Sequence, residues 1–133
     1  DNRRLLATYL ASRPIGGGVG SAGNWGKRFT PNTFLANVAT DSWYVMIWAE
    51  TGVVGLLLHI SILLFIVIKS AWILMAKLKD TELIIPLIGL SSGMFGIMLA
   101  SYGNGVLGQM PNGIIIYLSM TFIWKLLVRV DGQ

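Results

Sequence analysis

Of the 133 residues, 54% are hydrophobic and 12% are charged, a balance that excludes an ordinary soluble domain, in which about a quarter of the residues are charged. The formal net charge is +4, but the basic residues divide between the first third of the chain and the ends of apolar segments, so nucleic acid is not an expected partner. The chain contains no cysteine, which excludes disulfides and thiolate metal sites.

The first 50 residues predict a water-facing loop that is partly helical. Leucine and tyrosine recur at helical spacing in its first part, which predicts an amphipathic helix over about 2–12 that Pro14 ends. The glycine-rich run that follows cannot form regular structure, and residues 24–40 are expected to be irregular. Asp41 and Ser42 are residue types that cap helices, so they predict the start of the next helix.

Three apolar segments predict membrane-spanning helices, over about 52–75, 83–102 and 114–129. A helix needs about 20 apolar residues to cross a bilayer. Between Leu83 and Trp124 there is no Asp, Glu, Lys, Arg or His. The expected fold class is therefore an all-α membrane protein, with about three transmembrane helices in residues 51–133 preceded by a partly helical extracytoplasmic loop in residues 1–50.

The charged residues at the ends of these segments set their expected orientation. The link at 103–113 carries no charge, whereas the opposite ends of the spans carry Lys69, Lys77, Lys79, Lys125 and Arg129. Lysine and arginine accumulate in cytoplasmic loops. We therefore expect the 77–82 loop and the C-terminus to be cytoplasmic, and residues 1–50 and 103–113 to face outward.

Basic residues in the outward loop run against this bias and favour an anionic partner. They are Arg3, Arg4, Arg13, Lys27 and Arg28. A guanidinium group is always charged and holds phosphate oxygens in a fork, so Arg3, Arg4 and Arg13 are candidate ligands of a phosphate group. The alternative for these three is solvation in the loop or contact with anionic headgroups. Lys27 and Arg28 are interpreted as ordinary loop charges.

Several short motifs follow one another in a recognisable order. Arg-Pro-Ile-Gly-Gly-Gly-Val-Gly at 13–20 is followed by Asp-Ser-Trp-Tyr at 41–44 and Glu-Thr-Gly-Val-Val-Gly at 50–55. This order resembles the O-antigen ligase family of polytopic membrane glycosyltransferases, which includes O-antigen polymerase-type enzymes. The resemblance covers residues 3 to about 58. Ser-Tyr-Gly-Asn at 101–104 and Gly-Gln-Met-Pro at 108–111 resemble a Bacteroidetes-type subgroup of that family.

The resemblance implies an enzyme of lipopolysaccharide or related polysaccharide biosynthesis that uses no metal and no cofactor. Such an enzyme transfers an oligo- or polysaccharide from an undecaprenyl-diphosphate carrier to a glycan or lipid A-core acceptor. It would be a multi-pass protein of the bacterial inner (cytoplasmic) membrane, with residues 1–50 periplasmic. Arg3, Arg4 and Arg13 would then stabilise the diphosphate as it leaves. Ligase and polymerase activities remain open, because they differ in the acceptor.

Two further expectations concern the extent of the protein and a rival class. The chain begins at Asp1 with no methionine and no signal-like apolar segment, so we expect a piece of a longer membrane protein, inactive without its upstream transmembrane helices. The rival to an enzyme is a transporter or anchor fragment whose arginines only hold anionic lipid. The number of upstream spans in the complete protein distinguishes the two.

Two carboxylates are candidates for the general base. Where the family has His-Asn, this chain has Asp41 and Ser42. If burial made its charged form less favourable, Asp41 could take a proton from an acceptor hydroxyl; the alternative is that it only caps the helix. Glu50 could orient an arginine, act as the base instead, or be a solvated helix end.

The glycine-rich run and a histidine complete the candidate residues. Gly16, Gly18 and Gly20 belong to a run whose N–H groups could form a nest for an anion, although a plain turn between two helices is the favoured interpretation. His59 lies within the first predicted span. An ionisable residue there is a functional candidate by default, and the alternative is a neutral histidine bonded to a neighbouring helix.

Overall fold

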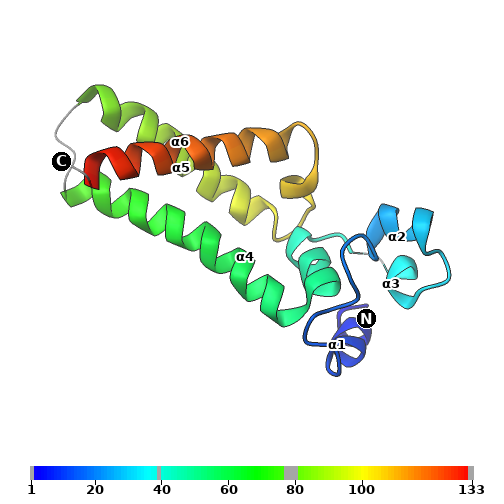
Figure 1. Cartoon of the computed structure of the whole chain (residues 1–133). Helices are drawn as coiled ribbons and strands as arrows, with labels where there is room; N and C mark the ends of the chain where they lie inside the picture. Colours follow the sequence, from blue (N-terminus) through cyan, green and yellow to red (C-terminus); the bar gives the residue numbers. More distant parts are fainter. Residues whose placement is uncertain (1, 39, 77–80, 132–133) are drawn as a thin grey trace. The chain divides into compact units, whose positions relative to one another are not determined.

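The computed structural model describes residues 2–38, 40–76 and 81–131, and all the regular structure in these residues is helical, which confirms the expected all-α class (Figure 1). The elements are α1 (Asn2–Leu10), α2 (Gly23–Phe29), α3 (Phe34–Asn37), α4 (Trp43–Ala76), α5 (Thr81–Ala100), the 3-10 turn η1 (Val106–Gly108) and α6 (Asn112–Asp131). The chain divides into two compact units. The first unit is Asp1–Ile60 with Tyr102–Gly105, and the second unit is Ser61–Ser101 with Val106–Gln133.

Three of these helices are long and apolar enough to cross a membrane. They are Trp43–Ala76, Glu82–Ala100 and Asn112–Val130. Apolar side chains lie on every side of them, and many are exposed in the isolated chain, such as Leu58, Ile85 and Phe122. Helices that are hydrophobic all round are typical of membrane spans. The expectation of three apolar spans is therefore confirmed, and the pattern is that of a multi-pass membrane protein.

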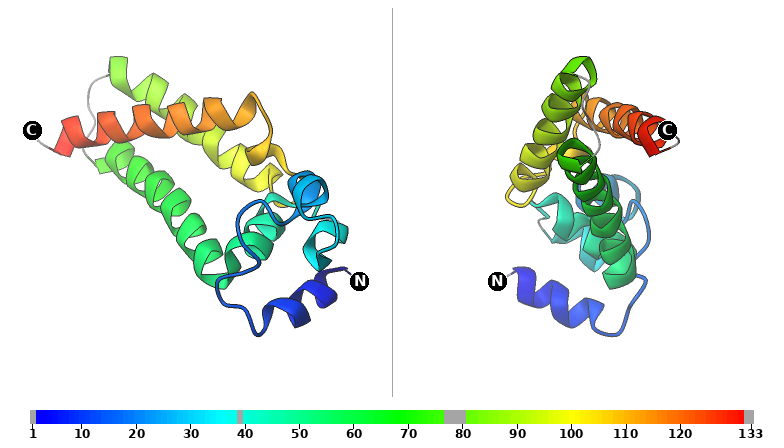
Figure 2. Two further views of the ribbon diagram at one scale, coloured as in Figure 1. Left: turned by 45° about the vertical axis from the view of Figure 1, so that its right-hand side comes forward. Right: turned by 90° about the vertical axis from the view of Figure 1, so that its left-hand side faces the viewer.

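The second unit is built by helices that pack along one another. In this unit α5 and α6 lie side by side and η1 packs against both, as the two orientations of Figure 2 show. The interior is formed by Leu63, Ile73, Leu87, Ile116, Ile123 and Leu127, each at most 2% exposed. The rings of Phe65 and Trp124 meet at a centroid distance of 6.2 Å. Small polar groups in these helices bond backward to their own backbone, as Ser119 Oγ does to Ile115 O at 2.7 Å.

The first unit has a small core of its own. Its buried members are Leu6, Ala22, Leu35, Val38 and Ala49, contributed by α1, the loops, α3 and the start of α4. The Tyr9 ring stacks on Phe34 with centroids 4.7 Å apart and joins α1 to α3. This core holds residues 2–38 against the first turns of α4.

The prediction that residues 24–40 are irregular is wrong, because α2 and α3 lie there. These helices have 7 and 4 residues, too few to show a helical period or to be stable alone. Contacts with the rest of the unit stabilise them. Leu35 and Ala36 of α3 are buried, and Gly26 of α2 is buried against the backbone of Ser21.

Candidate functional site

The first spanning helix is broken near its start. Gly52 has φ 70° and ψ −168°, so the helix runs from Trp43 to the residue before Gly52 and then begins again on a new axis. The change of direction in α4 is plain in Figure 2. A helix that ends leaves its last carbonyl groups without intrahelical partners. These carbonyls need donors from elsewhere, since a polar group left unpaired away from water is costly.

The glycine loop, residues 14–22, supplies those donors. Gly17 N–H donates to the Ala49 carbonyl at 2.9 Å, and Gly18 N–H donates to the Glu50 carbonyl at 2.9 Å. The loop therefore caps the first part of α4 from a distant point in the sequence. Two motifs that are separate in the sequence form one structural element.

The two motifs meet where neither has a side chain. Gly16 and Gly52 both have positive φ, 76° and 70°. A Cβ on Gly16 would lie 2.5 Å from the Gly52 nitrogen and 2.6 Å from the Glu50 carbonyl oxygen, and a Cβ on Gly52 would collide with the Pro14 carbonyl. Glycine is required at both positions, because any side chain would be strained and would push the loop off the helix.

The anion-nest interpretation of this loop finds little support in its hydrogen bonds. Gly16 N–H donates to Arg13 O at 3.0 Å, and the N–H groups of Gly17 and Gly18 are bonded to the α4 carbonyls. Donors already bonded to protein carbonyls are not available to a phosphate. Gly18 and Gly20 have positive φ in open space, as residues of a turn do. The loop is a turn that also caps a helix.

Glu50 lies inside the first unit and is not a solvated helix end. It is 8% exposed, and its Oε1 accepts a hydrogen bond from the Ala22 N–H at 3.4 Å. Ala22 is the N-cap residue of α2 and is 1% exposed. The side chain of Glu50 thus contacts the far end of the glycine loop, while its backbone carbonyl holds the middle of the same loop. Glu50 therefore positions the glycine loop against α4.

Arg13 is exposed at the start of the glycine loop and is held by an aromatic ring. Its Nη1 donates to the Tyr9 hydroxyl at 2.6 Å, and its Cζ lies 4.5 Å from the centroid of the Tyr9 ring. A guanidinium group has five N–H donors in a rigid fork, and the contact with the hydroxyl uses one of them. Tyr9 therefore orients the guanidinium group of Arg13, which keeps donors for an anion.

The other predicted arginines are placed with less detail. Arg4 is exposed on α1, and its backbone carbonyl accepts a hydrogen bond from Thr8 Oγ1 at 3.0 Å. The backbone of Arg3 also lies in α1, but its side chain lies outside the described part of the chain. Both residues are on the helix whose core-facing side carries Leu6 and Leu10.

Asp41 is exposed, so the burial expected of a general base at this position is not found, and it lies two residues before the start of α4 at Trp43. The helix begins at Trp43, so Ser42 takes the N-cap position and its carbonyl accepts the first helical bond from Met46 N–H at 3.0 Å. The cap expected of Asp41 thus falls to Ser42. A Cβ on Gly105 would lie 3.9 Å from the Asp41 carbonyl oxygen, which places the segment after α5 next to this residue.

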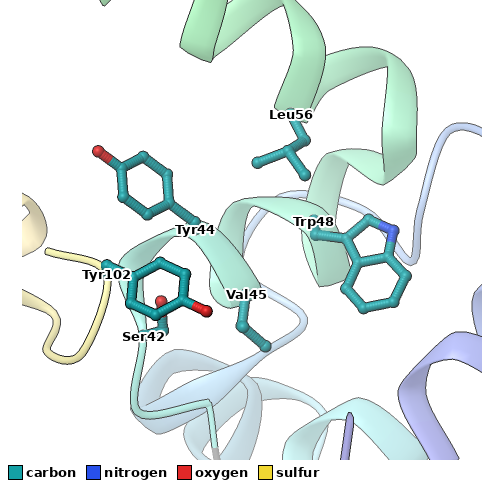
Figure 3. Close-up of a pocket in the computed structure, with 6 residues that line it drawn as sticks. All are labelled: Ser42, Tyr44, Val45, Trp48, Leu56 and Tyr102. Carbon is teal, nitrogen blue, oxygen red and sulfur yellow. The ribbon is translucent and has the colours of Figure 1, made fainter. Parts of the chain in front are cut away.

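A pocket opens beside the first turns of α4. Its volume is about 140 Å³, and it is lined by Ser42, Tyr44, Val45, Trp48, Leu56 and Tyr102 (Figure 3). Figure 3 shows the aromatic rings of two α4 residues and of Tyr102 arranged around it. The pocket is mostly apolar with a few hydroxyl groups, and it is smaller than the roughly 300–1,000 Å³ of most small-molecule sites. Sequence reasoning missed the pocket, because Tyr102 is distant in the chain and no spacing relates it to α4.

His59 follows on the same helix. Its ring lies 6.5 Å from the Tyr44 ring, tilted by 58°. Its Nε2 is buried and has no hydrogen-bond partner among the described residues. The expected bond from His59 to a neighbouring helix is therefore not present within residues 2–38, 40–76 and 81–131. Trp43 Nε1 is likewise buried and unpartnered in this part of the chain.

Comparison with protein-family models, with curated proteins and with solved structures found no significant match. The structure itself defines the class as far as an all-helical protein with three helices able to cross a membrane. In its first unit, the glycine loop is fastened to a broken helix, with an exposed arginine at one end of the loop and a buried glutamate beneath it.

Proposed function

We propose that this chain is part of a membrane glycosyltransferase that moves an oligo- or polysaccharide from undecaprenyl diphosphate to an acceptor glycan, as an O-antigen ligase does. The observation that carries the proposal is the contact between Gly16 and Gly52. These glycines belong to the two motifs on which the resemblance rests, and their contact gives a physical reason for both motifs to occur in one protein.

The contact also accounts for the placement of Arg13. Arg13 directly precedes the glycine loop, which is bonded to α4 at Gly17 and Gly18, so the arginine is tied to the outer end of a helix that can cross a membrane. A diphosphate on a lipid carrier lies at the membrane surface. A fixed guanidinium group at that level stabilises its charge without reorganisation during the reaction.

The proposed reaction needs only an acceptor hydroxyl and the lipid-linked donor. The acceptor oxygen forms a bond to the anomeric carbon of the donor sugar, and the bond from that carbon to the diphosphate oxygen breaks. The electron pair leaves with the diphosphate, whose negative charge Arg13 stabilises together with Arg3 and Arg4. The acceptor proton passes to Asp41, which is exposed and immediately precedes Ser42 of the pocket lining.

The orientation follows from the same proposal. Residues 1–50 and the link at 103–113 face the periplasm, and the C-terminus faces the cytoplasm of a bacterial inner membrane. The donor is then bound on the outer surface, where no nucleotide is required. A ligase and a polymerase share these residues and differ in the acceptor.

A lysine substitution at Arg13 tests the function. Arg13→Lys in the complete membrane protein keeps the charge but loses the bidentate fork, and we expect transfer from a lipid-diphosphate-linked saccharide to fall about tenfold or more. Lys27→Gln is the matched control, because it removes an exposed basic residue of the same outward segment and is expected to leave transfer unchanged. Normal transfer by Arg13→Lys, Arg3→Lys and Arg4→Lys alike, at normal expression, would mean that the arginine cluster is only a lipid anchor, which is the rival class.

A further inference from the structure

Helix α2 carries two aromatic side chains that the core of the first unit does not use. Trp25 is 59% exposed and Phe29 is 68% exposed. They stand four residues apart, on one side of the helix, and their rings stack at a centroid distance of 5.8 Å with 4° between their planes. The helix is held to the unit by another residue, Gly26, which is buried against the Ser21 backbone. The stacked pair is therefore not needed to attach α2.

A cation accompanies this pair. The Cζ of Arg28 lies 5.8 Å from the centroid of the Phe29 ring, and Lys27 and Arg28 form the basic last turn of α2, which has no acidic residue. Aromatic rings settle at the headgroup level of a bilayer, and arginine beside them is attracted to anionic lipid. An exposed apolar patch rimmed by basic residues thus has the chemistry of a membrane contact.

The patch also belongs to a body that is attached to a membrane span. The first unit includes α4 as far as Ile60, well into the first helix that can cross a membrane. A patch on such a unit is confined near the bilayer surface, so lipid is available to it at high local concentration. We propose that Trp25 and Phe29 insert into the interfacial layer of the membrane and that Arg28 binds anionic headgroups there. This assigns Arg28 a role beyond that of an ordinary loop charge.

The helix provides its own control residue. At 3.6 residues per turn, Lys27 lies about 180° around α2 from the middle of the Trp25–Phe29 face, whereas Arg28 lies at the edge of that face. Lys27 is exposed like the others. A probe at position 27 therefore reports the side of α2 that faces away from the membrane, and a probe at position 29 reports the side that faces it.

Single-cysteine labelling tests the proposal, since the chain has no cysteine of its own. Phe29→Cys and Lys27→Cys are each labelled with an environment-sensitive fluorophore, and the protein is reconstituted in vesicles of phosphatidylcholine with phosphatidylglycerol. Lipids with a quencher on the upper acyl chain should quench position 29 roughly twofold or more over position 27. Iodide in the buffer should quench position 27 more strongly.

The other outcomes overturn the proposal in different ways. Equal quenching by iodide at both positions would mean that the face is solvated. Protection of position 29 from iodide and from the lipid quencher alike would mean that a protein segment covers it. In a second arm, replacing phosphatidylglycerol by phosphatidylcholine should weaken lipid quenching at position 29, and Arg28→Gln should remove this dependence while Lys27→Gln retains it. Dependence on anionic lipid that survives Arg28→Gln would contradict the role of Arg28. None of these outcomes depends on the proposed reaction.

Discussion

Gly16 and Gly52 touch backbone to backbone, so closely that a Cβ on Gly16 would lie 2.5 Å from the Gly52 nitrogen. The contact occurs where α4 is broken, and the freed carbonyls of Ala49 and Glu50 accept hydrogen bonds from the loop. The break, the loop and the two glycines depend on one another. The first prediction therefore addresses this contact.

Gly52→Ala is expected to destabilise the protein strongly. Alanine at φ 70° and ψ −168° is strained by about 1–3 kcal/mol, because this conformation is essentially confined to glycine, and its methyl group would collide with the Pro14 carbonyl. Gly18→Ala is expected to cost only the strain, since its φ is 100° and its Cβ would meet open space. Thermal unfolding in detergent should rank the midpoints as wild type, then Gly18→Ala, then Gly52→Ala.

Gly96→Ala is the control for this series. Gly96 lies within α5, away from any positive φ, and a Cβ there would meet nothing within 4 Å. Alanine should be neutral or stabilise the helix by up to about 1 kcal/mol. A Gly52→Ala protein as stable as Gly96→Ala would mean that α4 is continuous and that the loop does not dock.

The second prediction concerns Glu50, the buried carboxylate. Glu50→Gln keeps an oxygen that can accept from Ala22 N–H, so stability and transfer activity should stay close to wild type. Glu50→Ala leaves that buried N–H without a partner, which costs about 1–3 kcal/mol. Chemical unfolding and transfer assays on both variants check this. Loss of transfer in a stable Glu50→Gln protein would instead make Glu50 the base.

The third prediction concerns topology. Cysteines at Asn24 and Gly108 should react with an impermeant thiol reagent in intact spheroplasts, because the bias of lysine and arginine toward cytoplasmic loops predicts that the opposite ends of the spans are cytoplasmic. A cysteine at Lys79 should react only after the membrane is permeabilised. Labelling of Lys79→Cys from outside would reverse the orientation and remove the arginines from the side on which the lipid donor is proposed to bind.

The sequence predicted the helices that can span a membrane, but it did not predict the break in α4 at Gly52. Long apolar stretches without charge are a strong signal, because a bilayer tolerates little else. A single glycine such as Gly52 in such a stretch is compatible with an unbroken helix, so the break could not be predicted from it. The break in α4 depends on the glycine loop, because the N–H groups of the loop reach the α4 carbonyls only once the chain has folded back onto α4.

The sequence indicated which residue types to consider for the candidate site, but not how these residues are arranged. Arg13 and Glu50 became candidates because charged residues are few in an apolar chain. The structure adds a hydrogen-bond partner for each of them. Tyr9 orients the arginine, and Ala22 binds the glutamate. Neither partner has a signature in the sequence, since a tyrosine on a short helix and a buried alanine are both ordinary. The sequence therefore could not predict these two contacts.

The last prediction tests Asp41 as the general base. The resemblance places a histidine where this chain has Asp41, and the structure leaves Asp41 exposed, followed by Ser42, which takes the cap position and lines the aromatic pocket. Asp41→Asn should abolish transfer in a folded, inserted protein, because an amide cannot take up the proton. Asparagine caps a helix about as well as aspartate, so an effect on the helix is not expected from this change.

Asp41→Ala and Asp41→His complete the test. Because Ser42 holds the N-cap position, Asp41→Ala should leave the stability of the helix close to wild type, and if Asp41 has no catalytic role both Asp41→Ala and Asp41→Asn should be silent in the transfer assay. Asp41→His places an imidazole at the position. If the residue acts as a base, this variant should retain part of the transfer activity. If it does not, the imidazole should give no advantage in transfer over Asp41→Asn. Full transfer by Asp41→Asn, with insertion confirmed by labelling at Asn24→Cys, would exclude Asp41. Since Glu50 is buried under the glycine loop, the base would then have to come from a residue outside this chain or from a rearrangement that exposes Glu50.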